Sequence, residues 1–284
     1  MKKIKLNAKA KINLTLDVLG VTNNYHDIKS LVTSVDVFDR ITVKKRRDGR
    51  ITLKTEGLPV GCSVHDNNAY KAAKLFKEEF GTKGVDILIE KRIPIGSGLG
   101  GSSADIAGVL NAMKALYEVD GDLIPLANAL GSDSAYMLTG GYALMTGRGD
   151  KVVHKKINTP LYFILITEPT IISARASYKK FDELGKTSKQ CTAIAEKALK
   201  DNDFDKFCSV IKNDLQDASA HLVPEINGNI YLLKKAGAPA ALMTGSGAAV
   251  YGVFNDKKSR DDAYKKLLPL CKENMFKVQT VQEQ

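Results

Sequence analysis

The chain has 284 residues, which is long enough for one large domain or for two packed halves with a substantial core. Apolar residues make up 44% and charged residues 26%, the balance of an ordinary globular protein, and no run of about twenty apolar residues occurs, which excludes a membrane-spanning helix. The net charge of +10 admits two explanations, an anionic partner such as a nucleotide or a nucleic acid, or a lysine-rich host proteome.

The first residues and the cysteines indicate the compartment. Charges interrupt the N-terminal segment MKKIKLNAKAKINL, so it does not have the apolar stretch of a secretory signal peptide. The cysteines are scattered without C-x-x-C spacing, which is typical of reduced thiols and not of a disulfide framework or a zinc site. We therefore expect a cytoplasmic protein without a protein-bound metal. The cysteines are Cys62, Cys191, Cys208 and Cys271.

Strands are predicted at the start of the chain. Apolar side chains occupy every second position of residues 4–18, which predicts one long strand or two strands joined by a bend. Lys11 and Asn13 lie on the opposite face of this segment. Residues 20–24 are predicted to form a loop.

The next two predicted strands, at residues 35–45 and 51–55, flank a turn at Asp48-Gly49. The only concentrated basic run, KKRR at residues 44–47, falls between them. We interpret it as the solvated end of a hairpin.

The central feature of the sequence is PIGSGLGGSSADIAGV at residues 94–109. A helix precedes it at residues 66–80, with Asp66 or Asn67 as N-cap and Gly81 as its end. The strand-like run VDILI comes next, and apolar residues at helical spacing follow the glycines. The glycines therefore lie where a strand ends and a helix begins, with unpaired amides at the positive end of the helix dipole. This arrangement predicts an anion site, most often for phosphate, although a plain turn is the simpler alternative.

Three known phosphate loops can be compared with this stretch. The P-loop pattern fails because no lysine follows the second glycine at the required place. The dinucleotide pattern G-x-G-x-x-G fits Gly96, Gly98 and Gly101, with Glu118 about twenty residues further on. The protein-kinase loop fails because Ser103 stands where a valine is required.

The second half of the chain mixes strands and helices without strict β-α-β alternation, which predicts an α+β fold and not a doubly wound sheet. The basic link HKKINTP suggests a domain boundary near residues 155–160. Predicted helices cover residues 125–131, 173–181, 189–200, 204–212, 226–236 and 258–271, and predicted strands cover 142–145, 161–167, two segments within 239–254, and 276–281.

Three stretches in order resemble the motifs of the GHMP kinases, the small-molecule kinases named for galactokinase, homoserine, mevalonate and phosphomevalonate kinases. They are AKAKINLTLDVLG near the N-terminus, PIGSGLGGSSADIAG in the centre and LMTGSGAAVYGVF near the C-terminus. The resemblance implies a two-domain α+β GHMP kinase fold. Its N-terminal ribosomal-protein-S5-like domain, with the ATP-binding glycine loop, would span residues 1–157, and its C-terminal ferredoxin-like α+β domain residues 158–284.

Four segments resemble one branch of this family, which phosphorylates a cytidine-diphosphate-linked polyol in non-mevalonate isoprenoid precursor biosynthesis. They are residues 10–14, 24–28, 98–107 and 130–137. The chain departs from that branch at Asn24, Ser102 and Ser134–Met137. Another GHMP kinase, of homoserine or mevalonate type, is the alternative within the family.

The resemblance implies the roles of individual residues. Asp133 would be the general base that accepts the proton of the hydroxyl, and Lys11 would keep it ionised. The cofactors implied are ATP and Mg²⁺, and the partner is the small-molecule acceptor. We expect no nucleic acid, no membrane, and a monomer or weak homodimer. The implied nucleotide contacts are Pro94, Gly96, Gly98, Leu99, Gly100, Gly101, Ser102, Ser103, Asn67 and Lys91, and the implied acceptor contacts are Asn13, Tyr25, His26 and Tyr178.

Two hypotheses from other classes remain beside the kinase. The G-x-G-x-x-G match is typical of a nicotinamide-dependent dehydrogenase, but antiparallel-looking strands precede it where a β-α-β unit should open. The net charge of +10 is compatible with a nucleic-acid-binding module, but the basic residues form no concentrated stripe.

Overall fold

The computed structural model describes residues 2–22, 25–271 and 274–281, and the chain forms two compact units. Unit 1 consists of Met1–Ala10, Val37–Ile95 and Gly100–Gly140, and unit 2 of Lys11–Asp36, Gly96–Leu99 and Gly141–Gln284. Both units combine helices with largely antiparallel sheets, so the predicted α+β class is confirmed. The predicted division at residue 157 stays a prediction, since the chain passes between the compact units several times.

The sheet of unit 1 contains a strand order that the sequence did not suggest. Strand β5 (Val85–Lys91) lies between β3 (Tyr25–Lys45) and β4 (Thr52–Gly57). It pairs antiparallel with β3 and parallel with β4. The predicted hairpin around Asp48-Gly49 is therefore wrong, because the strands on its two sides each pair with β5.

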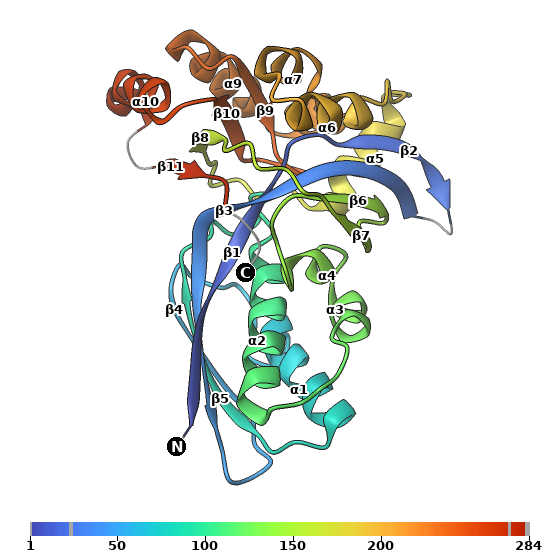
Figure 1. Cartoon of the computed structure of the whole chain (residues 1–284), viewed down its shortest axis with the longest axis vertical. Helices are drawn as coiled ribbons and strands as arrows, with labels where there is room; N and C mark the ends of the chain where they lie inside the picture. Colours follow the sequence, from blue (N-terminus) through green and yellow to red (C-terminus); the bar gives the residue numbers. More distant parts are fainter. Residues whose placement is uncertain (1, 23–24, 272–273, 282–284) are drawn as a thin grey trace. The chain divides into compact units, whose positions relative to one another are not determined.

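The helices of unit 1 lie on one side of its strands (Figure 1). The predicted caps of the first helix are confirmed: Asn67 Oδ1 accepts a hydrogen bond from Ala69 N at 2.9 Å, and Gly81 ends the helix with φ +61°. Helix α2 packs closely on the sheet, since a Cβ atom at Gly108 would lie 2.4 Å from Ile41 Cδ1. The helices are α1 (Asn68–Phe80), α2 (Gly101–Tyr117), α3 (Ile124–Leu130) and α4 (Ser134–Met137).

Unit 2 contains two groups of strands. In the first, the N-terminal half of β3 pairs with β2 (Asp17–Thr22) and with β6 (Ala143–Gly147), which pairs with β7 (Lys151–His154). Strand β1 (Lys3–Asn13) precedes β2, so of the two alternatives for residues 4–18 the structure confirms two strands joined by a bend, which starts after Asn13. The predicted loop at 20–24 is wrong up to Thr22, where β2 ends, and residues 23–24 lie outside the described residues.

The second sheet of unit 2 has the order β11-β8-β10-β9. Its strand β8 is buried over four of five residues, as the apolar run at 161–167 predicts. The strands are β8 (Tyr162–Ile166), β9 (Ala240–Met243), β10 (Val250–Phe254) and β11 (Met275–Gln279).

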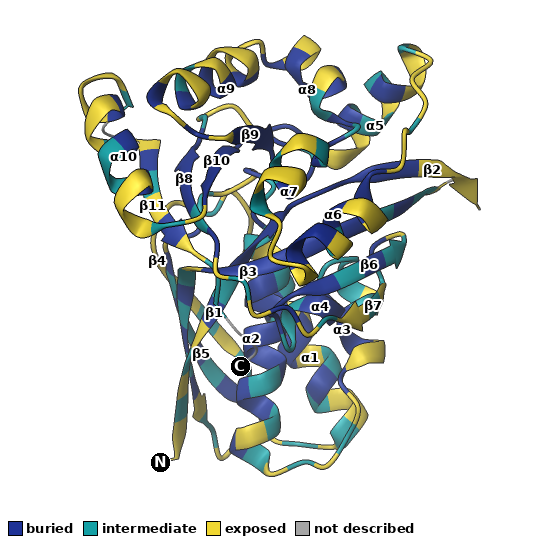
Figure 2. Ribbon diagram, turned by 45° about the horizontal axis from the view of Figure 1, so that its top comes forward, coloured by how far each residue is buried: buried dark blue, intermediate teal, exposed yellow. Residues whose placement is uncertain are grey.

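Helices pack on this second sheet and complete the core of unit 2. A Cβ atom at Gly252 of β10 would lie 2.9 Å from Ala238 Cβ and 3.2 Å from Leu233 Cδ2, which shows how closely α9 approaches the strand. The buried residues of these strands and helices are dark blue in Figure 2. No helix in the described part of the chain has the length and apolar character needed to cross a membrane. The helices are α5 (Ala174–Glu183), α6 (Thr192–Lys200), α7 (Phe204–Val210), α8 (Gln216–Leu222), α9 (Glu225–Ala236) and α10 (Lys257–Cys271).

Candidate active site

The first half of the glycine loop is bound to the C-terminal motif within unit 2. The carbonyl oxygen of Ser97 accepts a hydrogen bond from Ala249 N at 3.1 Å. Thr244 O lies so near Gly98 that a Cβ atom there would come within 2.3 Å of it. The carbonyl oxygen of Leu99 accepts a hydrogen bond from Lys11 N at 3.0 Å. Segments from three distant parts of the sequence therefore meet at this loop.

The Lys11 side chain belongs to the same cluster. It is buried, and its ammonium donates a hydrogen bond to Asn13 Oδ1. The Asn13 amide nitrogen donates in turn to Ser30 Oγ at 2.8 Å, and the Asn13 main-chain N–H donates to Thr244 Oγ1 at 2.9 Å. A Cβ atom at Gly245 would lie 3.2 Å from Lys11 Nζ. The cation is thus held beside the glycine loop by a chain of buried polar side chains.

Replacing Gly98 with alanine is expected to displace the loop. Gly98 has φ +82°, a conformation that other L-residues rarely adopt, and a methyl group would clash with Thr244 O. Backbone strain of this kind costs about 1–3 kcal/mol. We expect a higher KM for ATP and a lower thermal unfolding midpoint. Gly61→Ala is the matched control, because Gly61 is exposed and a Cβ atom there meets nothing within 4 Å. An equal effect in both variants would contradict this expectation.

The second half of the loop opens helix α2 in unit 1. Gly100 is the N-cap residue and adopts a left-handed conformation, with φ +76°. It forms no side-chain cap, so no N-cap side chain covers the first amides of the helix. The hydroxyl of Ser102 accepts a hydrogen bond from Asn68 Nδ2 at 3.0 Å. This helix start has the features of a phosphate site.

The loop that carries Asp133 lies against the same helix start. A Cβ atom at Gly131 would lie 3.3 Å from Ser103 Oγ and 2.9 Å from Ser134 Oγ. The Ser134 hydroxyl is buried, and it has no hydrogen-bond partner among the described residues. Asp133 is half-buried and precedes helix α4, but its carboxylate does not cap that helix. The capping role that a turn aspartate usually has is therefore not used here.

Lys11 and Asp133 belong to different units, so the approach of these two side chains stays a prediction. Within each unit the predicted residues do gather. Lys11, Asn13, Gly98 and Leu99 share one cluster, and the loop of Asp133 lies beside Ser103.

Lys91 has a structural environment that does not favour the predicted nucleotide contact. The side chain is only 5% exposed, and its ammonium pairs with Asp39 and, at 2.6 Å, with Asp105 Oδ2. Asp39 also accepts hydrogen bonds from the main-chain N–H groups of Arg92 and Ile93, at 2.5 and 2.9 Å. Asp39 lies in β3, Lys91 at the end of β5 and Asp105 in α2, so this buried triad joins the three elements.

The ionisation of the triad follows from its burial. Burial works against the charged ammonium of Lys91, but the attraction of the two carboxylates outweighs it and raises its pKa. Burial also raises the pKa of the Asp105 carboxyl, and the nearby Asp39 charge adds to this effect. Asp105 Oδ1 has no hydrogen-bond partner in the described part of the chain. A proton on Asp105 would leave one cation facing one carboxylate.

The aromatic residues of the predicted acceptor site lie in unit 2. The rings of His26 and Tyr178 stack, with centroids 4.6 Å apart and an interplanar angle of 19°. His26 Nε2 lies 2.8 Å from Asp182 Oδ1. Tyr25, the preceding residue, is 57% exposed, and the Arg148 guanidinium lies 5.1 Å from its ring centroid. The structure thus places His26 and Tyr178 together.

A cavity of about 330 Å³ lies beside this stack. His26 and Asp182 are part of its wall, and β2, Phe181 of α5 and the segment after α5 supply the rest. The lining residues are Val18, Leu19, Gly20, Val21, His26, Phe181, Asp182, Lys186, Thr187, Ser188 and Gln190.

Three residues near the loop were not predicted as site residues. Thr244 Oγ1 accepts a hydrogen bond from Asn13 N, and Asn68 Nδ2 donates one to Ser102 Oγ. Asn213 Nδ2 donates to the carbonyl oxygens of Met243 and Gly245, at 2.9 and 2.8 Å, and so fixes the C-terminal motif. Thr244 carries a signal, since it belongs to the third motif, whereas no local pattern distinguishes Asn213 or Asn68.

Two family models match the chain. That of the GHMP kinases N-terminal domain matches residues 67–146, and that of the GHMP kinases C-terminal region matches residues 195–270. Together they cover more than half of the sequence.

A relative from Staphylococcus aureus strain JH9, provisionally named a 4-diphosphocytidyl-2-C-methyl-D-erythritol kinase, is 35% identical over 94% of this chain and 95% of its own length. The crystal structure of a 4-(cytidine 5′-diphospho)-2C-methyl-D-erythritol kinase matches with a TM-score of 0.83 and 27% identity over 98% of this chain and 100% of that chain. A homoserine kinase from Cytophaga hutchinsonii shares the fold, with a TM-score of 0.76 and 19% identity over 100% and 96% of the two chains. The predicted two-domain fold is thereby confirmed, and this chain belongs to the GHMP kinase family as an ATP-dependent kinase.

Proposed function

We propose that this protein transfers the γ-phosphate of ATP to the 2-hydroxyl of 4-diphosphocytidyl-2-C-methyl-D-erythritol, a step of non-mevalonate isoprenoid precursor biosynthesis. Two relatives that match nearly the whole chain, at 35% and 27% identity, carry the name of this activity. The observation that carries the proposal is the stack of His26 on Tyr178, with Tyr25 next in the chain. Flat rings and an imidazole can stack on a pyrimidine and bind its polar edge.

The chain's own groups would perform the transfer mainly by positioning charge. The main-chain amides at the start of α2 would bind the phosphates, and Lys11 would orient the γ-phosphate and the hydroxyl. Asp133 would accept the hydroxyl proton as the oxygen forms its bond to phosphorus and the bond to ADP breaks. The step requires no covalent bond between the protein and either substrate.

Mg²⁺ requires oxygen ligands, keeps several waters, and shares the phosphates of its substrate. The described residues contain no group of three or more histidine, cysteine or acidic side chains that could hold a metal by themselves. The Ser103 hydroxyl and the nearby buried Ser134 hydroxyl are oxygen ligands of the kind that fits such an ion. In our proposal Ser102 and Ser103 would hold Mg²⁺ beside the phosphates, and the ion would supply positive charge to them.

Replacing Tyr178 with alanine is expected to weaken acceptor binding selectively. An aromatic stack contributes about 0.5–1.5 kcal/mol, so the KM for the cytidyl acceptor should rise about two- to tenfold. The KM for ATP should stay unchanged. Steady-state kinetics with each substrate varied in turn measures both values. Tyr231→Ala, which removes a ring that is 63% exposed on α9, is the matched control.

The acceptor itself is tested by comparing turnover of the cytidyl compound with turnover of homoserine and of mevalonate. The proposal requires the cytidyl compound to have the highest kcat/KM. A preference for homoserine or mevalonate would reject it and leave the kinase assignment intact.

A further inference from the structure

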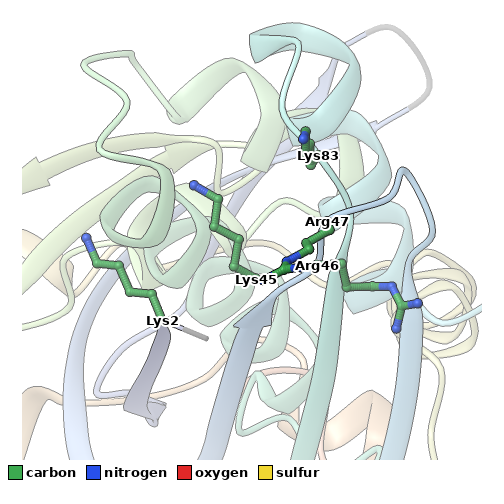
Figure 3. Close-up of a pocket in the computed structure, with 5 residues that line it drawn as sticks. All are labelled: Lys2, Lys45, Arg46, Arg47 and Lys83. Atoms are coloured by element: carbon green, nitrogen blue, oxygen red, sulfur yellow. The ribbon is translucent and has the colours of Figure 1, made fainter.

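The described residues that line a cavity of about 210 Å³ in unit 1 are all cationic: Lys2, Lys45, Arg46, Arg47 and Lys83. Figure 3 shows them at the ends of neighbouring strands, with one arginine side chain extending away from the lysines. They come from three separate segments, one before β1, one at the end of β3 and one before β5. Three of the five lining residues belong to the basic run at residues 44–47, which the sequence pattern predicts to be a solvated hairpin end.

Carboxylates compensate only part of this charge. Arg46 pairs with Asp48 Oδ1 at 2.7 Å and with Asp86 Oδ1 at 2.5 Å, and Lys2 pairs with Glu118. In the part of the chain that the structure describes, no acidic side chain forms an ion pair with the other three cations. Of these, Lys45 lies over the Tyr117 ring, 4.7 Å from its centroid, and Arg47 and Lys83 are exposed.

The backbone that carries these cations is held in place by hydrogen bonds. Lys45 N donates to Lys2 O at 3.1 Å, and Arg46 N donates to Gly84 O at 3.0 Å. The Tyr117 hydroxyl donates to the carbonyl oxygens of Lys83 and Gly84, at 2.9 and 2.8 Å. The backbone that carries these cations is therefore fixed, which reduces the conformational entropy lost when a ligand binds.

Like charges gathered in one concavity repel each other, and a bound anion removes that cost. The carboxyl end of α2, at Tyr117, attracts positive charge and accounts for one or two cations nearby. It does not account for all three cations that have no carboxylate partner among the described residues. Guanidinium groups bind phosphate oxygens in pairs, and ammonium groups add point charges, so this set suits a ligand with two adjacent phosphates.

We propose that this cavity binds a small diphosphate, either inorganic diphosphate or the diphosphate end of a small metabolite. The site is separate from the glycine loop. Gly101 and Tyr117 are the two ends of α2, which places them about 24 Å apart at 1.5 Å per residue. A strand of RNA is a less suitable ligand, because none of the described residues that line the cavity is aromatic and Lys45 covers the nearby Tyr117 ring.

The test is isothermal titration of the full chain with inorganic diphosphate at low salt, with the nucleotide site saturated by a non-hydrolysable ATP analogue. We expect one diphosphate per chain. The double variant Arg47→Glu, Lys83→Glu should bind it at least tenfold more weakly. Lys234→Glu, Lys235→Glu, which reverses two exposed lysines of α9, makes the same change in net charge and should leave binding unchanged. Thermal unfolding confirms that each variant is folded.

A parallel titration with a simple alkyl diphosphate distinguishes the two sources of the ligand. Tighter binding of the alkyl compound points to a metabolite, and tighter binding of the inorganic ion points to free diphosphate. Three results would overturn the proposal: no binding when the nucleotide site is filled, equal weakening in both double variants, or tighter binding of a short RNA than of either diphosphate.

Discussion

Replacing Lys91 with methionine is expected to lower the free energy of unfolding by about 3–5 kcal/mol. The ammonium is 5% exposed and is shared by two buried carboxylates, so its removal leaves Asp39 and Asp105 facing each other without a cation. Methionine has a similar length and no charge, so the effect reports the lost charge and not a cavity. Urea unfolding at neutral pH measures the difference.

Lys54→Met is the matched control, because this lysine pairs with Glu56 on the same strand, β4, and its side chain is 73% exposed. Exposed pairs contribute about 0–1 kcal/mol. Similar losses in the two variants would show that the triad has no special role.

The same triad makes a pH-dependent contribution. The pKa of Asp105 is raised in the folded state, so the folded protein binds this proton more tightly than the unfolded chain. Its contribution to stability is complete below the ordinary pKa of an aspartate and is lost as the pH rises through the higher, folded-state pKa. The free energy of unfolding of Asp105→Asn should therefore depend less on pH in this range. At neutral pH this substitution should lower the free energy of unfolding less than Lys91→Met does.

Replacing Asp133 with asparagine is expected to lower kcat by about a hundredfold or more, because general-base catalysis contributes about 10²–10⁴-fold. Asparagine keeps the shape of the side chain but cannot accept the hydroxyl proton. The KM for ATP and the free energy of unfolding should change little, since asparagine has the same size and keeps the polar character of the side chain. A coupled assay of ADP release with saturating substrates measures kcat.

Asp120→Asn is the control for this variant, because Asp120 is an exposed residue shortly after α2. It should have normal turnover. Turnover close to normal in Asp133→Asn would remove this residue from the mechanism, and the proton would then have to leave by another route.

Much of the fold was predictable because local signals agree with it. Helix α1 has both its caps in the sequence, and β8 is a short apolar run that is buried as expected. The order β3-β5-β4 was not predictable, since a strand from more than thirty residues downstream lies between two that are adjacent in the chain. The N-terminal half of β3 was missed because buried Ser30, Thr33 and Ser34 interrupt its apolar pattern.

The candidate site shows the same division between local and distant contributions. The glycine loop could be found because its residues are consecutive and their spacing is distinctive. The buried serines of β3 are tolerated only through distant partners, such as Thr15 O for Ser30 and Gly141 N for Ser34. Likewise, the Lys91 triad depends on Asp39 and Asp105, which are 52 and 14 positions away. A single sequence gives no sign that such residues meet.

The 21-residue strand β3 continues from one compact unit into the other, and the chain makes the same passage in β1. Leu16, Val18 and Ile28 belong to a hydrophobic core whose other members extend to Met275. A nascent chain therefore cannot complete that core until Met275 has left the ribosome. Until then, the apolar side chains of the earlier residues lack part of their packing partners.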